Sequence, residues 1–155
     1  MSKAFTRESD NSAENFAPLR APLPPGTQNY ITTEGAAKIR AELNRLLESK
    51  RNTSATENRS AIEQRIQYLQ SLIGTFVVVE SGASDVVRFG STVKVLQNGE
   101  AETYRIVGVD EIDLERDHIS WLSPLARALM SRKVGDEIEF RAPSGLQKLK
   151  VLSIQ

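Results

Sequence analysis

Residues 32–74 read TTEGAAKIRAELNRLLESKRNTSATENRSAIEQRIQYLQSLIG, and apolar side chains recur through them at spacings of four and three. The first run consists of Ile39, Leu43 and Leu46, and the second of Ile62, Ile66, Leu69 and Ile73. That spacing is typical of one buried face on an α-helix. The polar segment 50–56 separates the runs, and Gly74 ends the second. Two helices joined by a short polar loop are expected to form an antiparallel coiled-coil hairpin over residues 29–74.

The first helix starts beside residues suited to cap it. The hydroxyl of Thr32 or Thr33 can accept a hydrogen bond from a free backbone N–H, and Glu34 places negative charge where the helix dipole favours it. A helix of about 18 residues would be about 27 Å long at 1.5 Å per residue.

After Gly74 the pattern changes to strands. β-Branched runs occupy residues 76–79, 92–96 and 104–109, and Asn98-Gly99 between the last two predicts a type I′ hairpin turn. A second hairpin is expected at residues 143–145, between strands at residues 137–141 and 147–152. Ser123-Pro124 predicts a capped helix that runs to about Ser131. The fold class is therefore α+β, with residues 75–155 forming an antiparallel sheet domain with one helix.

Composition excludes several kinds of site. The chain has 155 residues, 20 Lys and Arg, 20 Asp and Glu, one His and no Cys. Thiolate nucleophiles and Cys-ligated zinc are excluded, and the balanced charge gives no general attraction to nucleic acid.

Residues 1–28 are polar and then proline-rich, which predicts a disordered tail. With neither a membrane-length apolar run nor a signal-peptide core, the sequence predicts a soluble, cytoplasmic protein that contacts no membrane.

Three strings carry a family resemblance: FGSTVKV (89–95), YRIVGVDEID (104–113) and HISWLSPLARALMSRKVGDEIEF (118–140). In this order and spacing they resemble the Gre family of bacterial transcript-cleavage factors, over about residues 86–153. The segments YITTEGAAKIRAEL (30–43) and RIQYLQ (65–70) resemble the GreB branch.

The resemblance implies that the sheet domain is FKBP-like and docks at the rim of the secondary channel of bacterial RNA polymerase. It places the polymerase contact at Leu122, Ser123, Pro124 and Arg127. Relatives usually have a polar or acidic residue at the position of Leu122, so this surface is expected to be more apolar. In the family, the hairpin points down the channel, and an Asp followed by Glu-Asn at its tip helps to hold the Mg²⁺ at which the polymerase hydrolyses backtracked RNA.

The hairpin tip departs from that pattern. With the family's Glu-Asn aligned on Glu57-Asn58, Ser54 stands where the Asp should be. Both helices are shorter by more than two turns, and about 10 missing residues would withdraw the tip by about 15 Å. A metal role for Glu57 competes with a structural one, because Ser54 to Glu57 fits the S/T-x-x-E capping box. Arg51 and Arg59 make the tip basic, so it could contact RNA phosphate, a nucleotide or an acidic protein surface. The alternative is that the tip is a solvated loop that contacts nothing.

Three further features have ordinary readings as well as functional ones. Trp121 is either an interface anchor or a core residue, and the core is favoured. The acidic residues Asp110, Glu111, Asp113, Glu115 and Asp117 are expected to form a solvated loop rather than a cation site or a surface for a basic partner. His118 has no second ligand or nucleophile nearby in the sequence, so no role is assigned to it.

The sequence thus predicts a monomeric, non-enzymatic transcription elongation regulator that binds RNA polymerase, contacts nascent RNA at most indirectly and lacks efficient transcript-cleavage activity. It would have no cofactor of its own, and Mg²⁺ of the polymerase would matter only if Glu57 reaches it. The alternative is an active GreB-like cleavage factor that uses Glu57. A peptidyl-prolyl isomerase would follow from the fold alone, which does not establish function.

Overall fold

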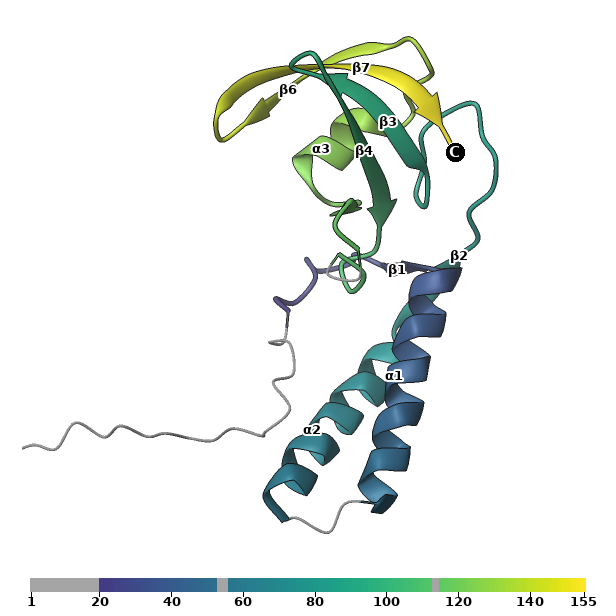
Figure 1. The fold of residues 1–155 in the computed structure, drawn as a ribbon, viewed down its shortest axis with the longest axis vertical. Helices are drawn as coiled ribbons and strands as arrows, with labels where there is room; N and C mark the ends of the chain where they lie inside the picture. The colour runs from purple at the N-terminus through teal and green to yellow at the C-terminus, as the bar shows by residue number, and fades with distance from the viewer. Residues whose placement is uncertain (1–19, 53–55, 113–114) are drawn as a thin grey trace, which may run out of the picture. The chain divides into compact units, whose positions relative to one another are not determined.

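A computed structural model describes residues 20–52, 56–112 and 115–155, with nothing described of the side chains of residues 56 and 57. The chain has two compact units, and the α+β class is confirmed (Figure 1). The helical unit contains Lys38–Gly74, and the sheet unit consists of Leu23–Ala37 with Thr75–Gln155. Most of the predicted disordered tail, residues 1–19, lies outside the described residues. No described helix has the length and hydropathy of a membrane span.

Two helices, α1 (Thr33–Asn52) and α2 (Thr56–Ile73), run through residues 33–73. Most of the predicted apolar face is buried in the helical unit: Ile39, Leu46, Ile62, Ile66 and Leu69. Leu43 and Ile73 are half-buried, and Leu72, which was not predicted, is buried beside Ile73 in the chain. Arg65 pairs with Glu42 at 3.0 Å and Lys50 with Glu63 at 3.4 Å, so the later part of α1 lies beside the early part of α2, as in an antiparallel pair. Two packed helices are therefore observed, whereas the regular interlocking of a coiled coil stays a prediction.

The main sheet has five strands in the order β5-β4-β3-β7-β6. Their bounds are β3 (Thr92–Gln97), β4 (Glu100–Val107), β5 (His118–Ser120), β6 (Glu137–Ala142) and β7 (Gly145–Ile154). The predicted purely antiparallel sheet is wrong at one edge, because β5 pairs parallel to β4. Ten residues, 108–117, separate the two strands in the sequence, which is more than the two-residue turn of a tight antiparallel hairpin.

Both predicted hairpins are confirmed. Asn98 and Gly99 have φ of 53° and 81°, and they join β3 to β4 between the paired residues Gln97 and Glu100. Positive φ at both positions is what a type I′ turn requires, and glycine adopts it without steric penalty. The second hairpin joins β6 to β7, with residues 142 and 145 paired across the turn.

Helix α3 (Pro124–Leu129) covers the core of the sheet unit. Ser123 caps it by accepting a hydrogen bond from the Ala126 N–H at 3.2 Å, as predicted. The buried core comprises Val87, Val93, Val95, Ile106, Ala126, Leu129, Ile138, Leu149 and Val151. The helix ends before the predicted Ser131, because Ser131 has φ of 68°, a left-handed conformation that helical backbone does not have.

A second, two-stranded sheet pairs β1 (Asn29–Thr32) with β2 (Phe76–Val79) in parallel. The sequence predicted β2 but not β1, and it assigned residues 29–37 to the hairpin. In the structure these residues belong to the sheet unit. Tyr30 of β1 packs there against Phe89 and Trp121, with ring centroids at 5.9 and 5.0 Å.

Candidate interaction surfaces and the start of the first helix

The residues predicted to contact the polymerase lie in α3 or just before it, and they are called the α3 surface below: Leu122, Ser123, Pro124 and Arg127. Pro124 and Arg127 are exposed, whereas Leu122 and Ser123 are half-buried. The Ser123 hydroxyl accepts the capping hydrogen bond, so this side chain shapes the helix start. The groups of the α3 surface that are open to a partner are therefore the Pro124 ring and the Arg127 guanidinium, with part of Leu122.

Trp121 supports this surface from the core side. Its ring packs edge-on against Tyr30 and Phe89, with centroids at 5.0 and 6.4 Å, and it contacts the hydrophobic core. Edge-to-face packing of this kind stabilises aromatic clusters. The favoured assignment of Trp121 to the core is consistent with these contacts, and the ring remains half-buried.

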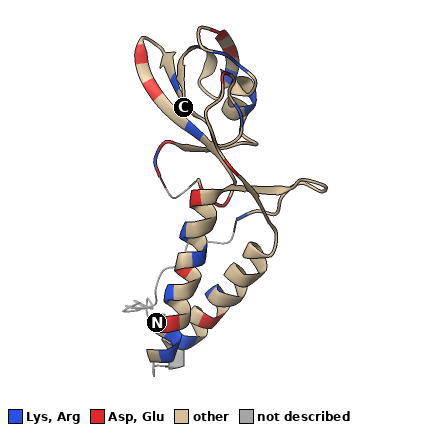
Figure 2. Ribbon diagram, turned by 90° about the vertical axis from the view of Figure 1, so that its right-hand side faces the viewer, with Lys and Arg blue, Asp and Glu red and all other residues tan. Residues whose placement is uncertain are grey.

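The hairpin tip is partly described. Arg51 in the last turn of α1 pairs with Glu48 at 3.6 Å, and Arg59 in α2 pairs with Glu63 at 3.4 Å. Basic and acidic residues lie close together at this end of the helices (Figure 2). Such exposed pairs contribute about 0–1 kcal/mol, so the arginines are free to exchange partners at little cost.

Other predicted tip features fall largely outside the description. Asn58 is half-buried in α2, and Glu57 lies in α2 without a described side chain. Ser54 is outside the described residues, and so is the predicted capping box. The described part of the chain contains no cluster of three or more His, Asp or Glu side chains able to hold a metal ion.

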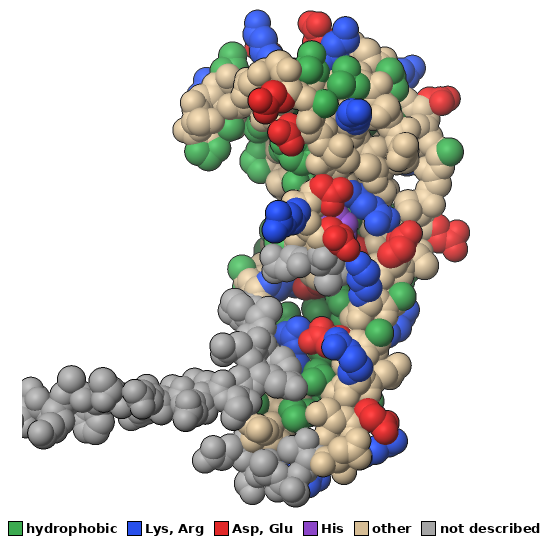
Figure 3. Space-filling model, in the orientation of Figure 1, with side chains coloured by type: hydrophobic (Ala, Val, Ile, Leu, Met, Phe, Trp, Pro, Cys, Tyr) green, Lys and Arg blue, Asp and Glu red, His purple; other side chains and the backbone are tan. Residues whose placement is uncertain are grey.

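Charge is mixed on the face of the molecule drawn in Figure 3. Acidic and basic side chains alternate over the face seen in Figure 3, without a large area of one sign. The chain has 20 basic and 20 acidic residues, and on this face residues of the two signs lie next to one another. Recognition is expected to depend on local groups more than on long-range attraction.

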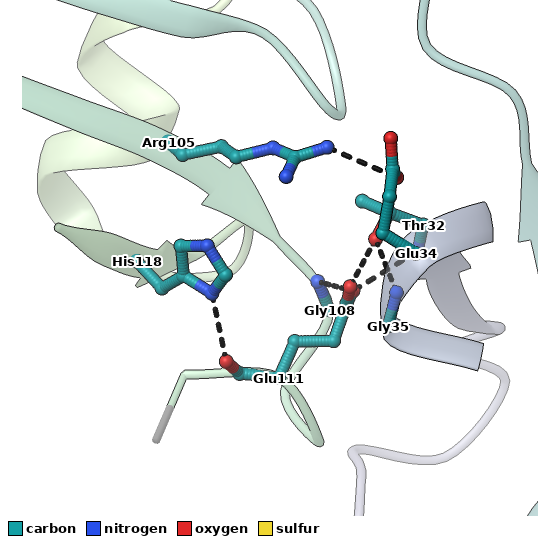
Figure 4. A network of polar contacts seen from close by, with 7 residues as sticks. All are labelled: Thr32, Glu34, Gly35, Arg105, Gly108, Glu111 and His118. Carbon is teal, nitrogen blue, oxygen red and sulfur yellow. Dashed lines mark hydrogen bonds and ion pairs between the residues drawn. The ribbon is translucent and has the colours of Figure 1, made fainter. Parts of the chain in front are cut away.

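Glu111, predicted to belong to a solvated acidic loop, is completely buried, with 0% of its surface exposed. Its carboxylate accepts hydrogen bonds from the backbone N–H of Gly108 at 2.7 Å and of Thr32 at 3.0 Å, and from the Thr32 hydroxyl (Figure 4). The solvated interpretation is wrong for this residue. A buried carboxylate is tolerated when donors surround it, as they do here.

The same threonine starts α1. The Thr32 hydroxyl accepts from the Gly35 N–H at 3.0 Å, which is the geometry of a helix cap and confirms one of the two predicted caps. The hydroxyl thus donates to Glu111 and accepts from the helix. Glu111, Thr32, Gly35 and Gly108 are called the Glu111 anchor below.

Polar contacts flank the Glu111 anchor. Asn29 donates from its amide nitrogen to Asp110 at 3.0 Å, and the Arg105 guanidinium pairs with Glu34 at 3.1 Å. A backbone hydrogen bond lowers the pKa of Glu34 most, Arg105 lowers it further, and partial burial opposes both. His118 contacts the carbonyl oxygen of Glu111 through Nδ1 at 2.9 Å, which gives this histidine a structural contact.

A family model for the transcription elongation factor GreA/GreB C-terminal region matches residues 82–155. A GreB transcription elongation factor of Neisseria meningitidis is 34% identical over 154 residues, covering 83% of this chain and 94% of the relative. The chain belongs to the GreA/GreB family. A GreA transcription elongation factor of Nitratidesulfovibrio vulgaris is 36% identical, covering 93% of this chain and 91% of the relative.

Among solved structures, the GreA factor homolog Gfh1 of Thermus thermophilus is 24% identical, with a TM-score of 0.42, over 83% of this chain and 99% of that one. The GreA/GreB family model covers both the α3 surface and Glu111. It does not include the hairpin tip.

Proposed function

We propose that this protein is a transcription elongation regulator that binds bacterial RNA polymerase through its sheet unit, at the rim of the secondary channel, and lacks efficient transcript-cleavage activity of its own. The observation that carries the proposal is membership of the GreA/GreB family: the chain is 34% identical to a GreB relative, and the alignment covers 94% of that relative. A factor of this kind acts in the cytoplasm, and we propose that it does so as a monomer with an FKBP-like sheet unit.

The α3 surface is the proposed contact with the polymerase. Pro124 presents a rigid ring, Arg127 presents an exposed cation, and Leu122 adds apolar area beside Trp121. A small number of residues, often Trp, Tyr or Arg, usually carries most of the binding free energy at an interface, and Arg127 is of this kind. An acidic groove or helix on the polymerase would complement Arg127.

Weak cleavage activity is proposed from the hairpin. Its helices have 20 and 18 residues, which correspond to about 30 and 27 Å. The cleavage factors that this chain resembles have helices more than two turns longer, and a Mg²⁺–oxygen bond tolerates no such deficit, since it spans only about 2 Å. Glu57 is the tip carboxylate that the resemblance aligns with the family's metal-holding Glu, and Ser54 stands where the family has its Asp. No cofactor of its own is required.

The proposal is tested by retention of core RNA polymerase on the immobilised protein. Pro124→Ala combined with Arg127→Glu should reduce retention at least tenfold, because both exposed groups of the α3 surface are changed. Glu137→Gln, an exposed charge removal on β6, is the matched control and should retain polymerase normally. Failure of the unchanged protein to retain polymerase would contradict the proposal.

One substitution distinguishes the alternative function, an active cleavage factor, from the proposed function. If Glu57 helps to hold Mg²⁺ of the polymerase, the unchanged protein shortens backtracked RNA and Glu57→Ala abolishes this. The proposed function predicts no shortening by either protein.

A further inference from the structure

The sheet unit has a polar hollow at the turn between β3 and β4, with a volume of about 480 Å³. Five residues line it, and together they are called the β4 hollow: Gln97, Asn98, Glu100, Glu102 and Tyr104. Alternate residues of a strand point to the same face, so Glu100, Glu102 and Tyr104 share one face of β4. Tyr104 also packs against the hydrophobic core. The two carboxylates therefore continue the core side of the sheet toward the turn.

A chain of hydrogen bonds fixes the side chains of the β4 hollow. The Tyr104 hydroxyl donates to Oε1 of Gln97 at 2.7 Å, and Nε2 of Gln97 donates to Oε1 of Gln147 at 3.0 Å. The Asn98 amide nitrogen donates to the same Gln147 oxygen at 3.2 Å, and Nε2 of Gln147 donates to Ser144 at 3.1 Å. Each of these side chains thus uses a donor within the network. The groups that the hollow offers to a ligand are mainly acceptors.

The carboxylates of the β4 hollow are exposed and carry unneutralised charge. No Lys or Arg within the described ranges forms an ion pair with Glu100 or Glu102. On β6, by contrast, Glu139 pairs with Lys148 at 3.7 Å. Burial raises the pKa of the Tyr104 hydroxyl most, and the negative charge of Glu102 raises it further. The negative charge is therefore felt inside the hollow itself.

We propose that the β4 hollow is an interaction site that binds an arginine side chain of a protein partner. A guanidinium has five N–H donors spread over a plane and no acceptor, which complements a site of acceptors and negative charge. Glu100 and Glu102 are two residues apart on an extended strand, so their Cα atoms are about 7 Å apart. A planar guanidinium placed between two such carboxylates donates to both.

The charge of the site decides the class of partner. Two carboxylates repel the phosphates of a nucleic acid and the headgroups of anionic lipids, and they attract a basic side chain. The hydrogen-bond network holds the lining side chains before a partner arrives, which lowers the entropic cost of binding. The β4 hollow shares no residue with the α3 surface, so this inference goes beyond the proposed polymerase contact and does not depend on it.

The test uses the whole chain, isotope-labelled for nuclear magnetic resonance, and N-acetyl-arginine amide as the probe. This capped arginine should cause saturable shifts of the backbone amide signals of residues 97–104. The neutral N-acetyl-glutamine amide should bind about tenfold more weakly or less. N-acetyl-lysine amide should also bind more weakly, because its ammonium is a point charge with three donors.

Two double variants identify the groups responsible. Glu100→Gln with Glu102→Gln keeps the side-chain size and removes both charges, so it should raise the Kd for capped arginine about tenfold or more. Glu137→Gln with Glu139→Gln is the matched control, since it removes two exposed carboxylates at the same spacing from β6 and should leave the Kd unchanged. Urea unfolding of both variants checks that the fold is retained.

A doubly capped pentapeptide with a central arginine tests whether the ligand is part of a polypeptide. It should bind at least as tightly as capped arginine, and weaker binding would overturn the assignment to a protein partner. The proposal is also overturned if capped arginine causes no saturable shifts, if the lysine or glutamine probe binds equally well, or if the two double variants bind capped arginine equally.

Discussion

Gly35→Ala is expected to destabilise the sheet unit, although alanine has a higher helix propensity than glycine. Alanine is favoured over glycine in a helix by about 1 kcal/mol. The added Cβ would, however, lie 1.9 Å from Oε1 and 2.4 Å from Cδ of the buried Glu111. Overpacking costs about 1–3 kcal/mol, and a buried donor that loses its acceptor costs about 1–3 kcal/mol more. The net loss in free energy of unfolding is therefore about 1–5 kcal/mol.

The assay is urea unfolding followed by fluorescence of Trp121, the one tryptophan of the chain, which lies in the same unit as Gly35. Gly82→Ala is the control, because nothing lies within 4 Å of a Cβ at that position and its φ is not positive. The control should be neutral or stabilising by up to about 1 kcal/mol. If Gly35→Ala is as stable as the parent, the close approach of Glu111 to α1 is refuted.

Three other substitutions have defined outcomes in the same unfolding assay. Ser123→Ala removes the α3 cap and should cost about 1 kcal/mol. Gly99→Ala should cost about 1–2 kcal/mol, because φ is 81° at this turn position, and unchanged stability would contradict the type I′ turn. The pKa of Glu34 lies below its ordinary value of 4.5, so its contribution is present above about pH 4.5 and is lost as pH falls through the lowered pKa. Glu34→Gln should therefore reduce the acid dependence of stability, and an unchanged acid profile would contradict a stabilising contribution of the ionised Glu34 carboxylate.

The features that the sequence predicted correctly depend on residues adjacent in the chain. Asn98-Gly99 determines its turn because both residues accept positive φ, and Ser123-Pro124 determines a helix start by capping and by a fixed φ. Neither requires knowledge of distant partners.

The strand pairings that the sequence missed are not local. β5 has only three residues, too few for an alternating pattern to identify it. β1 runs directly into the capping residues of α1, so residues 29–32 were assigned to the hairpin. Their positions are set by partners elsewhere in the chain, β4 for β5 and β2 for β1, which pair in parallel with them. A parallel pair leaves no turn signal between its strands.

Burial of Glu111 was missed for a related reason. Acidic residues crowd around it, a composition typical of a solvated loop, and its hydrogen-bond donors at Thr32 are 79 residues away. The one local signal is Gly108, which follows β4 and allows close backbone approach. Of the predicted site residues, the structure places those of the α3 surface in or just before α3, and it describes Arg51 in α1 and Asn58 and Arg59 in α2.

The most direct test of the proposed function uses stalled, backtracked elongation complexes incubated with this protein, with and without a full-length cleavage factor, and resolves the RNA by length. The account predicts no shortened RNA with this protein alone, and suppression of the cleavage produced by the added factor. Shortened RNA with this protein alone would contradict the proposed lack of efficient cleavage, and undiminished cleavage by the added factor would contradict binding at the secondary channel.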